Sequence, residues 1–322
     1  MKQNKHTFLF GGIIVVLLLF CMGILWKEHS RNKTLTASVK QEAMSEEKTH
    51  TYNEHLSNYL FLGVDTSEPV ETYEVQADAG QADTIFLVSL NRKTKEIQVL
   101  AIPRDTIAEI QVLAPGGKSL GTTKQHLNIQ YAFGDGKHKS CRLMKDAVSR
   151  LLDNLPIQGY CSLNLDGIPL LADLVDGVEV TIPDDSFEDA YPEFQEGTTV
   201  TLTSENVEAF VRYRDRTTSQ SALVRQEHQK LFLQAYLKKA REYQEKEAAF
   251  VTEMYEALEP YMVTNMGSDF FVDLLKASEE GEPISYTLPG EGREGSDGYE
   301  EYHVDEKALS DLLLQMFYRK DS

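Results

Sequence analysis

The chain of 322 residues carries a formal net charge of −19 and is 41% hydrophobic and 26% charged. This composition is typical of a folded globular protein and excludes disordered, collagen-like, coiled-coil and disulfide-dense chains. Residues 1–33 hold five basic and one acidic side chain, so residues 34–322 hold 27 basic against 50 acidic ones. A body this acidic repels phosphate backbones, which argues against nucleic-acid binding.

One segment near the N-terminus has the length and composition of a membrane span. Residues 8–26 contain no charged side chain, and a helix of this length is roughly 28 Å long, close to the thickness of a bilayer core. The segment is longer than most signal-peptide cores and no small-x-small cleavage site follows it, which favours a retained anchor over a cleaved signal. Basic residues lie on both sides of the span, so the positive-inside rule is nearly balanced. The short N-terminus favours residues 1–7 as a cytoplasmic tail, with the body outside.

The folded body is expected to begin near residue 57, after a polar linker over residues 27–56. Residues 59–65, 84–90 and 97–102 are apolar runs that predict buried strands. The polar residues 91–95 between the second and third runs predict a hairpin turn.

Helices and strands alternate further along the chain, which predicts an α/β or mixed α+β fold. A helix is expected over residues 140–153, with Leu143, Ala147 and Leu151 on one face. Further strands are expected at 160–165 and 178–182. Further helices are expected at 168–175, from Thr203 or Ser204 to Val211, and at 221–244, 247–258, 269–277 and 305–318. A loop is expected at 289–301.

The two cysteines outside the anchor leave two alternatives open. Cys141 and Cys161 form one disulfide, or they are two buried free thiols.

Acidic residues and an arginine are expected at one edge of the predicted sheet. A turn centred near residue 94 places Asp83 opposite Arg104 and beside Asp105. Asp65 joins the same edge if its strand runs parallel to the strand at 97–102. Three carboxylates at the ends of strands would suit a divalent cation with oxygen ligands, such as Mg²⁺.

Arginines gather in a second segment. Arg212 and Arg214 share a face if the chain is extended after the preceding helix, and Arg216 and Arg225 follow within the next residues. Arginine is suited to bidentate contacts with phosphate. A purely structural interpretation stays open, in which Asp83 and Arg104 close the hairpin and these arginines pair with nearby glutamates.

Several short motifs, taken together, resemble the LytR-CpsA-Psr family of Gram-positive cell-envelope proteins over about residues 57–240. The motifs occur in the family's order and spacing: G-V-D at 63–65, Q-A-D-T-I at 81–85, A-I-P-R-D-T at 101–106, L-N-I-Q-Y-A-F-G at 127–134, N-L-D-G at 164–167, D-G-V-E-V at 176–180, V-R-Y-R at 211–214 and R-Q at 225–226.

The resemblance implies a central mixed sheet flanked by helices, with an apolar groove for a polyprenyl chain. It implies a phosphotransferase that takes a glycopolymer from a polyprenyl-pyrophosphate carrier and attaches it to peptidoglycan. In this interpretation Asp65 and Asp83 hold Mg²⁺, and Asp105 is a candidate base for the acceptor hydroxyl. The residues implied to contact the pyrophosphate are Arg104, Arg212, Arg214, Arg225 and Gln226. Arg104 and Arg212 are, with Asp105, the catalytic candidates. Residues 241–322 are expected to form a helical extension outside the shared core.

Two departures from the family pattern favour an alternative. The family commonly has an arginine where this chain has Gln81, and a D-x-G-R sequence where it has residues 219–222, S-Q-S-A. Each lost charge-assisted contact weakens pyrophosphate binding by roughly 1.5–3 kcal/mol. The alternative is therefore a non-catalytic lipid- or glycan-binding, or regulatory, protein of the envelope. A role in transcription would require contact with nucleic acid or a transcription factor, and the acidic body argues against direct contact with DNA.

Overall fold

A computed structural model describes most of the chain after residue 49. The described residues are 50–66, 69–72, 79–114, 116–187, 190–213, 221–247, 250–267, 270–271, 273–274, 277–278, 281, 283–296 and 298–320. The anchor expected at 8–26 lies outside them. Within them, no helix combines the length and apolar character that crossing a membrane requires.

The described residues form two compact units. We name residues 50–164, 263–266 and 277–320 the sheet unit, and residues 165–262 and 267–274 the helical unit.

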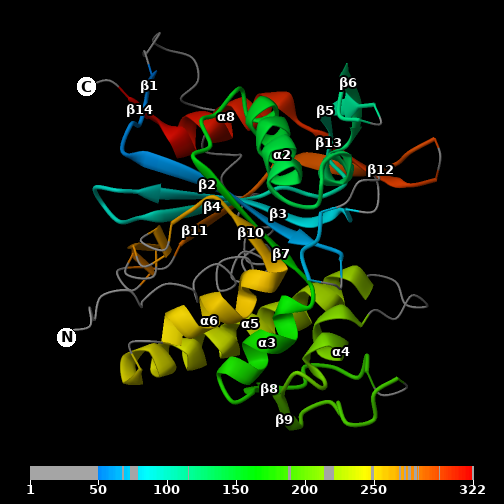
Figure 1. The fold of residues 1–322 in the computed structure, drawn as a ribbon, viewed down its shortest axis with the longest axis vertical. Coiled ribbons are helices and arrows are strands. Elements are labelled where there is room, and N and C mark those ends of the chain that lie inside the picture. Colours follow the sequence, from blue (N-terminus) through cyan, green and yellow to red (C-terminus); the bar gives the residue numbers. More distant parts are fainter. Residues whose placement is uncertain are drawn as a thin grey trace, which may run out of the picture. The chain divides into compact units, whose positions relative to one another are not determined.

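A six-stranded mixed sheet is the centre of the sheet unit (Figure 1). In order across the sheet the strands are β10 (Met262–Thr264), β7 (Gly159–Asn164), β2 (Leu56–Val64), β3 (Ala82–Asn91), β4 (Ile97–Ala101) and β11 (Ile284–Thr287). Neighbouring strands β2 and β3 are antiparallel, as are β3 and β4, whereas β7 is parallel to β2 and β11 is parallel to β4. This confirms the expected mixed α/β fold with a central mixed sheet.

Helices α2 (His138–Leu151) and α8 (Glu306–Phe317) bury their apolar sides in the same core as the sheet. Alternate residues of β2, such as Leu60 and Leu62, point into this core, because side chains of a strand alternate between its two faces. Each of these side chains is fully buried. At about 25 cal/mol per Å² of apolar surface removed from water, such burial is the main term that stabilises the sheet.

Three two-stranded ladders complete the sheet unit. They pair β1 (His50–Tyr52) with β14 (Tyr318–Lys320), β5 (Ile107–Leu113) with β6 (Ser119–His126), and β12 (Gly290–Glu294) with β13 (Glu300–Val304). A 3₁₀ helix, η1 (Leu127–Phe133), follows β6.

The structure corrects three expectations from the sequence. The loop expected at 289–301 contains most of the β12–β13 hairpin, whose strands are too polar to show an apolar alternation. Strand β1 occupies part of the expected linker, because β14 supplies its partner. The tail expected to be a helical extension provides both edge strands of the central sheet, β10 and β11. These strands are three and four residues long, too short for a periodic signal.

The helical unit contains the elements expected over residues 165–258. They are α3 (Gly167–Leu174), β8 (Val178–Thr181), α4 (Val207–Arg212), α5 (Ser221–Lys246) and α6 (Phe250–Leu258). The structure adds two elements that the sequence does not predict, strand β9 (Thr199–Leu202), which pairs with β8, and the 3₁₀ turn η2 (Glu259–Tyr261). Helix α4 begins later than expected, with Asn206 at its N-cap, because residues 204–206 form a turn.

Both cysteines of the sheet unit are free thiols, which excludes the disulfide alternative. Cys141 and Cys161 are completely buried. Burial raises the pKa of the Cys141 thiol to about 12 and raises that of Cys161 as well, because desolvation disfavours the thiolate.

Candidate functional site

Polar side chains meet at one edge of the central sheet, as the sequence predicts. Strands β2 and β4 run in the same direction with β3 between them, so the ends of β2 and β4 lie beside the start of β3. The pairing of Phe86 with Ala101 places Asp83 opposite Arg104. Arg104 Nη1 donates a hydrogen bond to Asp83 Oδ1 at 2.5 Å. The carboxylate and the guanidinium are 39% and 45% exposed, so both can reach a ligand from solvent.

Asp65 follows the end of β2 at the same edge. Its Oδ1 accepts a hydrogen bond from the Gln81 backbone N–H at 2.6 Å, and its own N–H donates to the Gln81 carbonyl at 3.1 Å. Gly80 makes this close approach possible. It has a φ of +78°, and a Cβ there would lie 2.9 Å from Asp65 Oδ1 and 2.5 Å from Thr66 Cγ2.

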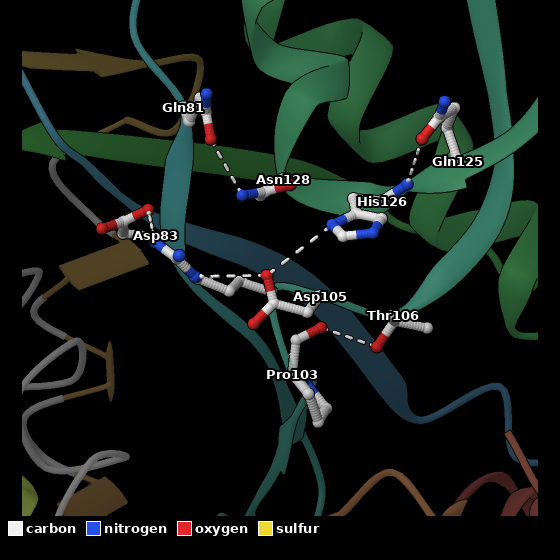
Figure 2. Close-up of polar contacts among 9 residues, drawn as sticks. Gln81, Asp83, Pro103, Asp105, Thr106, Gln125, His126 and Asn128 are labelled. Carbon is white, nitrogen blue, oxygen red and sulfur yellow. Dashed lines mark hydrogen bonds and ion pairs between the residues drawn. The ribbon is translucent and has the colours of Figure 1, made fainter. Parts of the chain in front are cut away.

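The turn after β4 holds the catalytic candidates Arg104 and Asp105. Asp105 Oδ1 lies 3.4 Å from Arg104 Nε and 3.8 Å from His126 Nδ1 (Figure 2). Partial burial disfavours the charge on Arg104, but the attraction of Asp83 and Asp105 is larger and raises the pKa of the guanidinium. Arg104 is therefore a permanent cation between two carboxylates.

Neighbouring elements fix the backbone of this turn. The N–H of Asn128 donates to the Arg104 carbonyl at 3.1 Å, and the N–H of Tyr302 donates to the Asp105 carbonyl at 2.9 Å. Within the turn, Thr106 Oγ1 donates to the Pro103 carbonyl at 2.6 Å (Figure 2). Bonds from η1 and β13 thus hold the two catalytic candidates on a rigid support, which is what a site for charge stabilisation requires.

The side chain at the position of the missing family arginine has a partner in this chain. Gln81 Oε1 accepts a hydrogen bond from Asn128 Nδ2 at 3.0 Å (Figure 2). Asn128 is 3% exposed and also donates its backbone N–H to Arg104. Gln81 is therefore part of the network that holds the turn, and it brings no positive charge.

The carboxylates Asp65 and Asp83 fit a magnesium ion that binds together with a substrate. Mg²⁺ usually retains several waters and is held by one or two carboxylates plus substrate phosphates. In the part of the chain that the structure describes, no three His, Cys, Asp or Glu side chains form a group that could hold a metal ion by themselves. Two carboxylates from the same sheet edge would need oxygen ligands from a substrate to complete such a site.

The other predicted site residues belong to the helical unit. Arg212 ends α4 and forms an ion pair with Glu208, one turn earlier, which is one of the pairings expected from a structural interpretation. Arg214 lies outside the described residues. Arg225 and Gln226 lie in the first two turns of α5, where the structure describes the backbone and not their side chains. The structure therefore brings together Asp65, Asp83, Arg104 and Asp105.

Sequence reasoning missed His126 and Asn128 as parts of this site. His126 lies outside the family motifs and has no partner at the spacing of metal ligands. Asn128 lies in the motif at 127–134, and the family resemblance implies no role for it. Their positions depend on the β5–β6 hairpin, where β6 is exposed along most of its length and has no apolar pattern. The polar N-Q pair within an otherwise apolar η1, Asn128 with Gln130, was the available signal, because buried amides need partners.

The model of the LytR_cpsA_psr family matches residues 24–317. The chain belongs to this family. The match extends through the C-terminal tail, in agreement with the two sheet strands that the tail provides.

Similar proteins cover nearly the whole chain. A Bacillus anthracis protein named polyisoprenyl-teichoic acid–peptidoglycan teichoic acid transferase TagU is 28% identical over 323 residues, covering 98% of this chain and 97% of that protein. The crystal structure of protein gbs0355 from Streptococcus agalactiae has a TM-score of 0.60 at 25% identity and covers 82% of this chain and 90% of its own. The crystal structure of B. subtilis TagU has a TM-score of 0.54 at 23% identity and covers 82% and 96%.

Proposed function

We propose that this protein attaches a glycopolymer from a polyprenyl-pyrophosphate carrier to peptidoglycan. The observation that carries the proposal is the Arg104–Asp83 pair beside Asp65 and Asp105, at the sheet edge of a chain that aligns along its length with teichoic acid transferases. The acceptor hydroxyl oxygen attacks the phosphorus next to the glycan. The bond from this phosphorus to the bridging oxygen breaks, and polyprenyl phosphate leaves with the bonding electrons. The product is a phosphodiester.

The residues of the site match the needs of phosphoryl transfer, which depends on positioning and charge neutralisation. Arg104 would bind the pyrophosphate, and the backbone hydrogen bonds to its turn would hold it in position. Asp65 and Asp83 would hold Mg²⁺, which neutralises negative charge on the pyrophosphate when bound. Asp105 would take part in the proton transfer from the acceptor hydroxyl. The further groups proposed to bind pyrophosphate, on the strength of the family motifs, are Arg212, Arg214, Arg225 and Gln226.

We place the body of the protein outside the cytoplasm. Residues 8–26 would anchor it in the cell membrane, with residues 1–7 inside. An anchored body is consistent with the proposed substrates, because both the lipid carrier and peptidoglycan lie at the outer face of the membrane in this reaction. An apolar groove for the polyprenyl chain remains a prediction of the family resemblance.

One observation favours a second candidate, a non-catalytic lipid- or glycan-binding or regulatory protein. Gln81 stands where the family commonly has arginine, and its side-chain oxygen is bonded to Asn128. This loses one cation from the pyrophosphate site. The acidic groups and Arg104 are retained, which favours the transferase.

A turnover assay tests the proposal. The full chain in detergent micelles is incubated with a polyprenyl-pyrophosphoryl oligosaccharide and peptidoglycan fragments, with and without Mg²⁺, and products are followed by mass spectrometry. We expect a phosphodiester-linked product that requires Mg²⁺ and is lost in Asp83→Asn. Asp146→Asn, on the exposed side of α2, is the matched control and should leave turnover unchanged. Tight lipid binding without turnover for several acceptors would favour the second candidate.

A further inference from the structure

A histidine lies next to the catalytic candidate Asp105. His126 ends β6 and pairs with Ile107 across the β5–β6 hairpin. Its Nδ1 lies 3.8 Å from Asp105 Oδ1, and the dashed line in Figure 2 marks this pair. The two side chains are 18% and 26% exposed, so they are shielded from bulk water and still reachable by a substrate.

Backbone bonds on both sides of the pair hold the two segments together. The N–H of Leu127 donates to the Thr106 carbonyl at 2.8 Å, and the N–H of Asn128 donates to the Arg104 carbonyl at 3.1 Å. A distance of 3.8 Å exceeds that of a hydrogen bond. Because the backbones are fixed, a small side-chain rotation is enough to form one, and catalytic hydrogen bonds commonly shorten when substrate binds.

The chemistry of the two groups assigns them different roles. A carboxyl group has a reference pKa near 4 and is a weak base at neutral pH, whereas an unperturbed imidazole titrates at about pH 6.5. Asp105 is also in contact with the Arg104 guanidinium, at 3.4 Å from Nε. A carboxylate that receives a ring N–H at Nδ1 leaves Nε2 of that ring as the acceptor.

We propose that His126 is the general base of the transfer and that Asp105 positions it. The inference rests on the proposed function and deepens it. Nε2 of His126 takes the proton of the acceptor hydroxyl while the oxygen bonds to phosphorus and the bond to the bridging oxygen breaks. Asp105 orients the ring and stabilises the imidazolium that forms. The proton leaves His126 to solvent or to the departing polyprenyl phosphate.

Other titratable groups lie on the elements around His126 and Asp105. The elements packed against His126 are β5, η1 and the turn after β4. The titratable groups that they and its own strand contribute are Arg104 and Asp105 in the turn, Glu109 on β5, Tyr131 on η1, and Lys124 on β6. Glu109 and Lys124 are directly opposite in the hairpin and offset each other. Among the residues that the structure describes, Asp105 is the acidic side chain within ion-pair distance of the ring.

The pH dependence of turnover tests the inference with the full chain in detergent micelles. The variants are His126→Gln, which cannot accept a proton, and the control His138→Gln, which removes an exposed histidine of α2 that contacts Tyr160. For the wild type we expect kcat to rise with pH, because a general base acts in its unprotonated form. His126→Gln should lower kcat by about 100-fold or more and remove this rise, with an unchanged KM for the lipid substrate. His138→Gln should behave as the wild type.

The outcomes separate the inference from the proposed function. No product from the wild-type chain would overturn the proposed function and the inference with it. Wild-type turnover with a His126→Gln variant that keeps the same pH dependence would overturn the inference alone. Asp105→Asn is the second variant, because it retains His126 and removes only the carboxylate that orients the imidazole ring. It should lower kcat less than His126→Gln does, and an equal or larger loss would make Asp105 the base.

Discussion

Removal of the Arg104 side chain separates a structural ion pair from a substrate contact. In Arg104→Ala the bond to Asp83 is lost, and the backbone carbonyl of Arg104 keeps its bond from Asn128. The guanidinium and carboxylate are 45% and 39% exposed, and exposed pairs contribute only about 0.2–1 kcal/mol to stability. The free energy of unfolding should therefore fall by less than about 1 kcal/mol.

The effect of the same change on turnover should be much larger. A charge-assisted contact to phosphate is worth roughly 1.5–3 kcal/mol, and about 1.4 kcal/mol corresponds to a factor of ten. The expected loss in kcat/KM is thus roughly 10- to 160-fold. Arg104→Lys keeps the charge and loses the planar fork, so its activity should lie between those of Arg104→Ala and the wild type.

Urea unfolding and the turnover assay with polyprenyl-pyrophosphoryl oligosaccharide measure the two effects on the same preparations. Arg293→Ala is the matched control, because it removes an exposed arginine–carboxylate pair with Glu291 on the β12–β13 hairpin. It should change neither quantity measurably. An Arg104→Ala protein with normal turnover would refute the substrate contact. A stability loss above about 2 kcal/mol would show that the pair is structural.

Three further predictions concern other parts of the chain. Gln81→Arg restores a cation at the sheet edge and should increase kcat/KM up to about tenfold. Loss of the hydrogen bond from Asn128 should lower the free energy of unfolding by about 1 kcal/mol. Unchanged kinetics would show that this position does not face the pyrophosphate. Partial burial disfavours ionised Asp184, but hydrogen bonds from Ser186 and the attraction of His228 are together larger, so the pKa of Asp184 lies below its usual value. A lowered folded-state pKa stabilises the protein above the unfolded pKa of about 4, and this contribution is lost as the pH falls through the folded value. In urea unfolding at several pH values, the free energy of unfolding of Asp184→Asn should therefore fall less at acid pH than that of the wild type. An identical pH dependence of the two proteins would contradict this role of Asp184. Cys141 and Cys161 should resist maleimide at pH 8 in the native protein, because both are buried and their thiol pKa values are raised. Both should react in urea, as followed by mass spectrometry. Labelling without urea would show that the core opens.

The hairpin at the centre of the site was predictable from the sequence. Two apolar runs flank a short polar turn, and a short turn determines which residues face each other. The expected pairing of Asp83 with Arg104 is confirmed. Strands β2 and β4 run in the same direction, which is the condition under which Asp65 joins this edge. The larger helices were also predictable, since their apolar residues recur at helical spacing.

The β5–β6 hairpin was not predictable, and with it the position of His126. Strand β6 is exposed over most of its length, so no apolar alternation marks it. Its register with β5, together with backbone bonds from η1 to the turn after β4, brings His126 next to Asp105. The bond between Gln81 and Asn128 likewise joins residues far apart in the chain.

Local elements, the acidic body and the motifs of the family resemblance can all be derived from the amino-acid sequence. They follow from composition, from spacing along the chain and from short turns, which act over a few residues. Three features emerge from the folded chain instead: the C-terminal tail provides both edges of the central sheet, the two cysteines are free, and His126 lies next to Asp105. Short strands and buried polar contacts are stabilised by partners distant in sequence, so no local pattern predicts them.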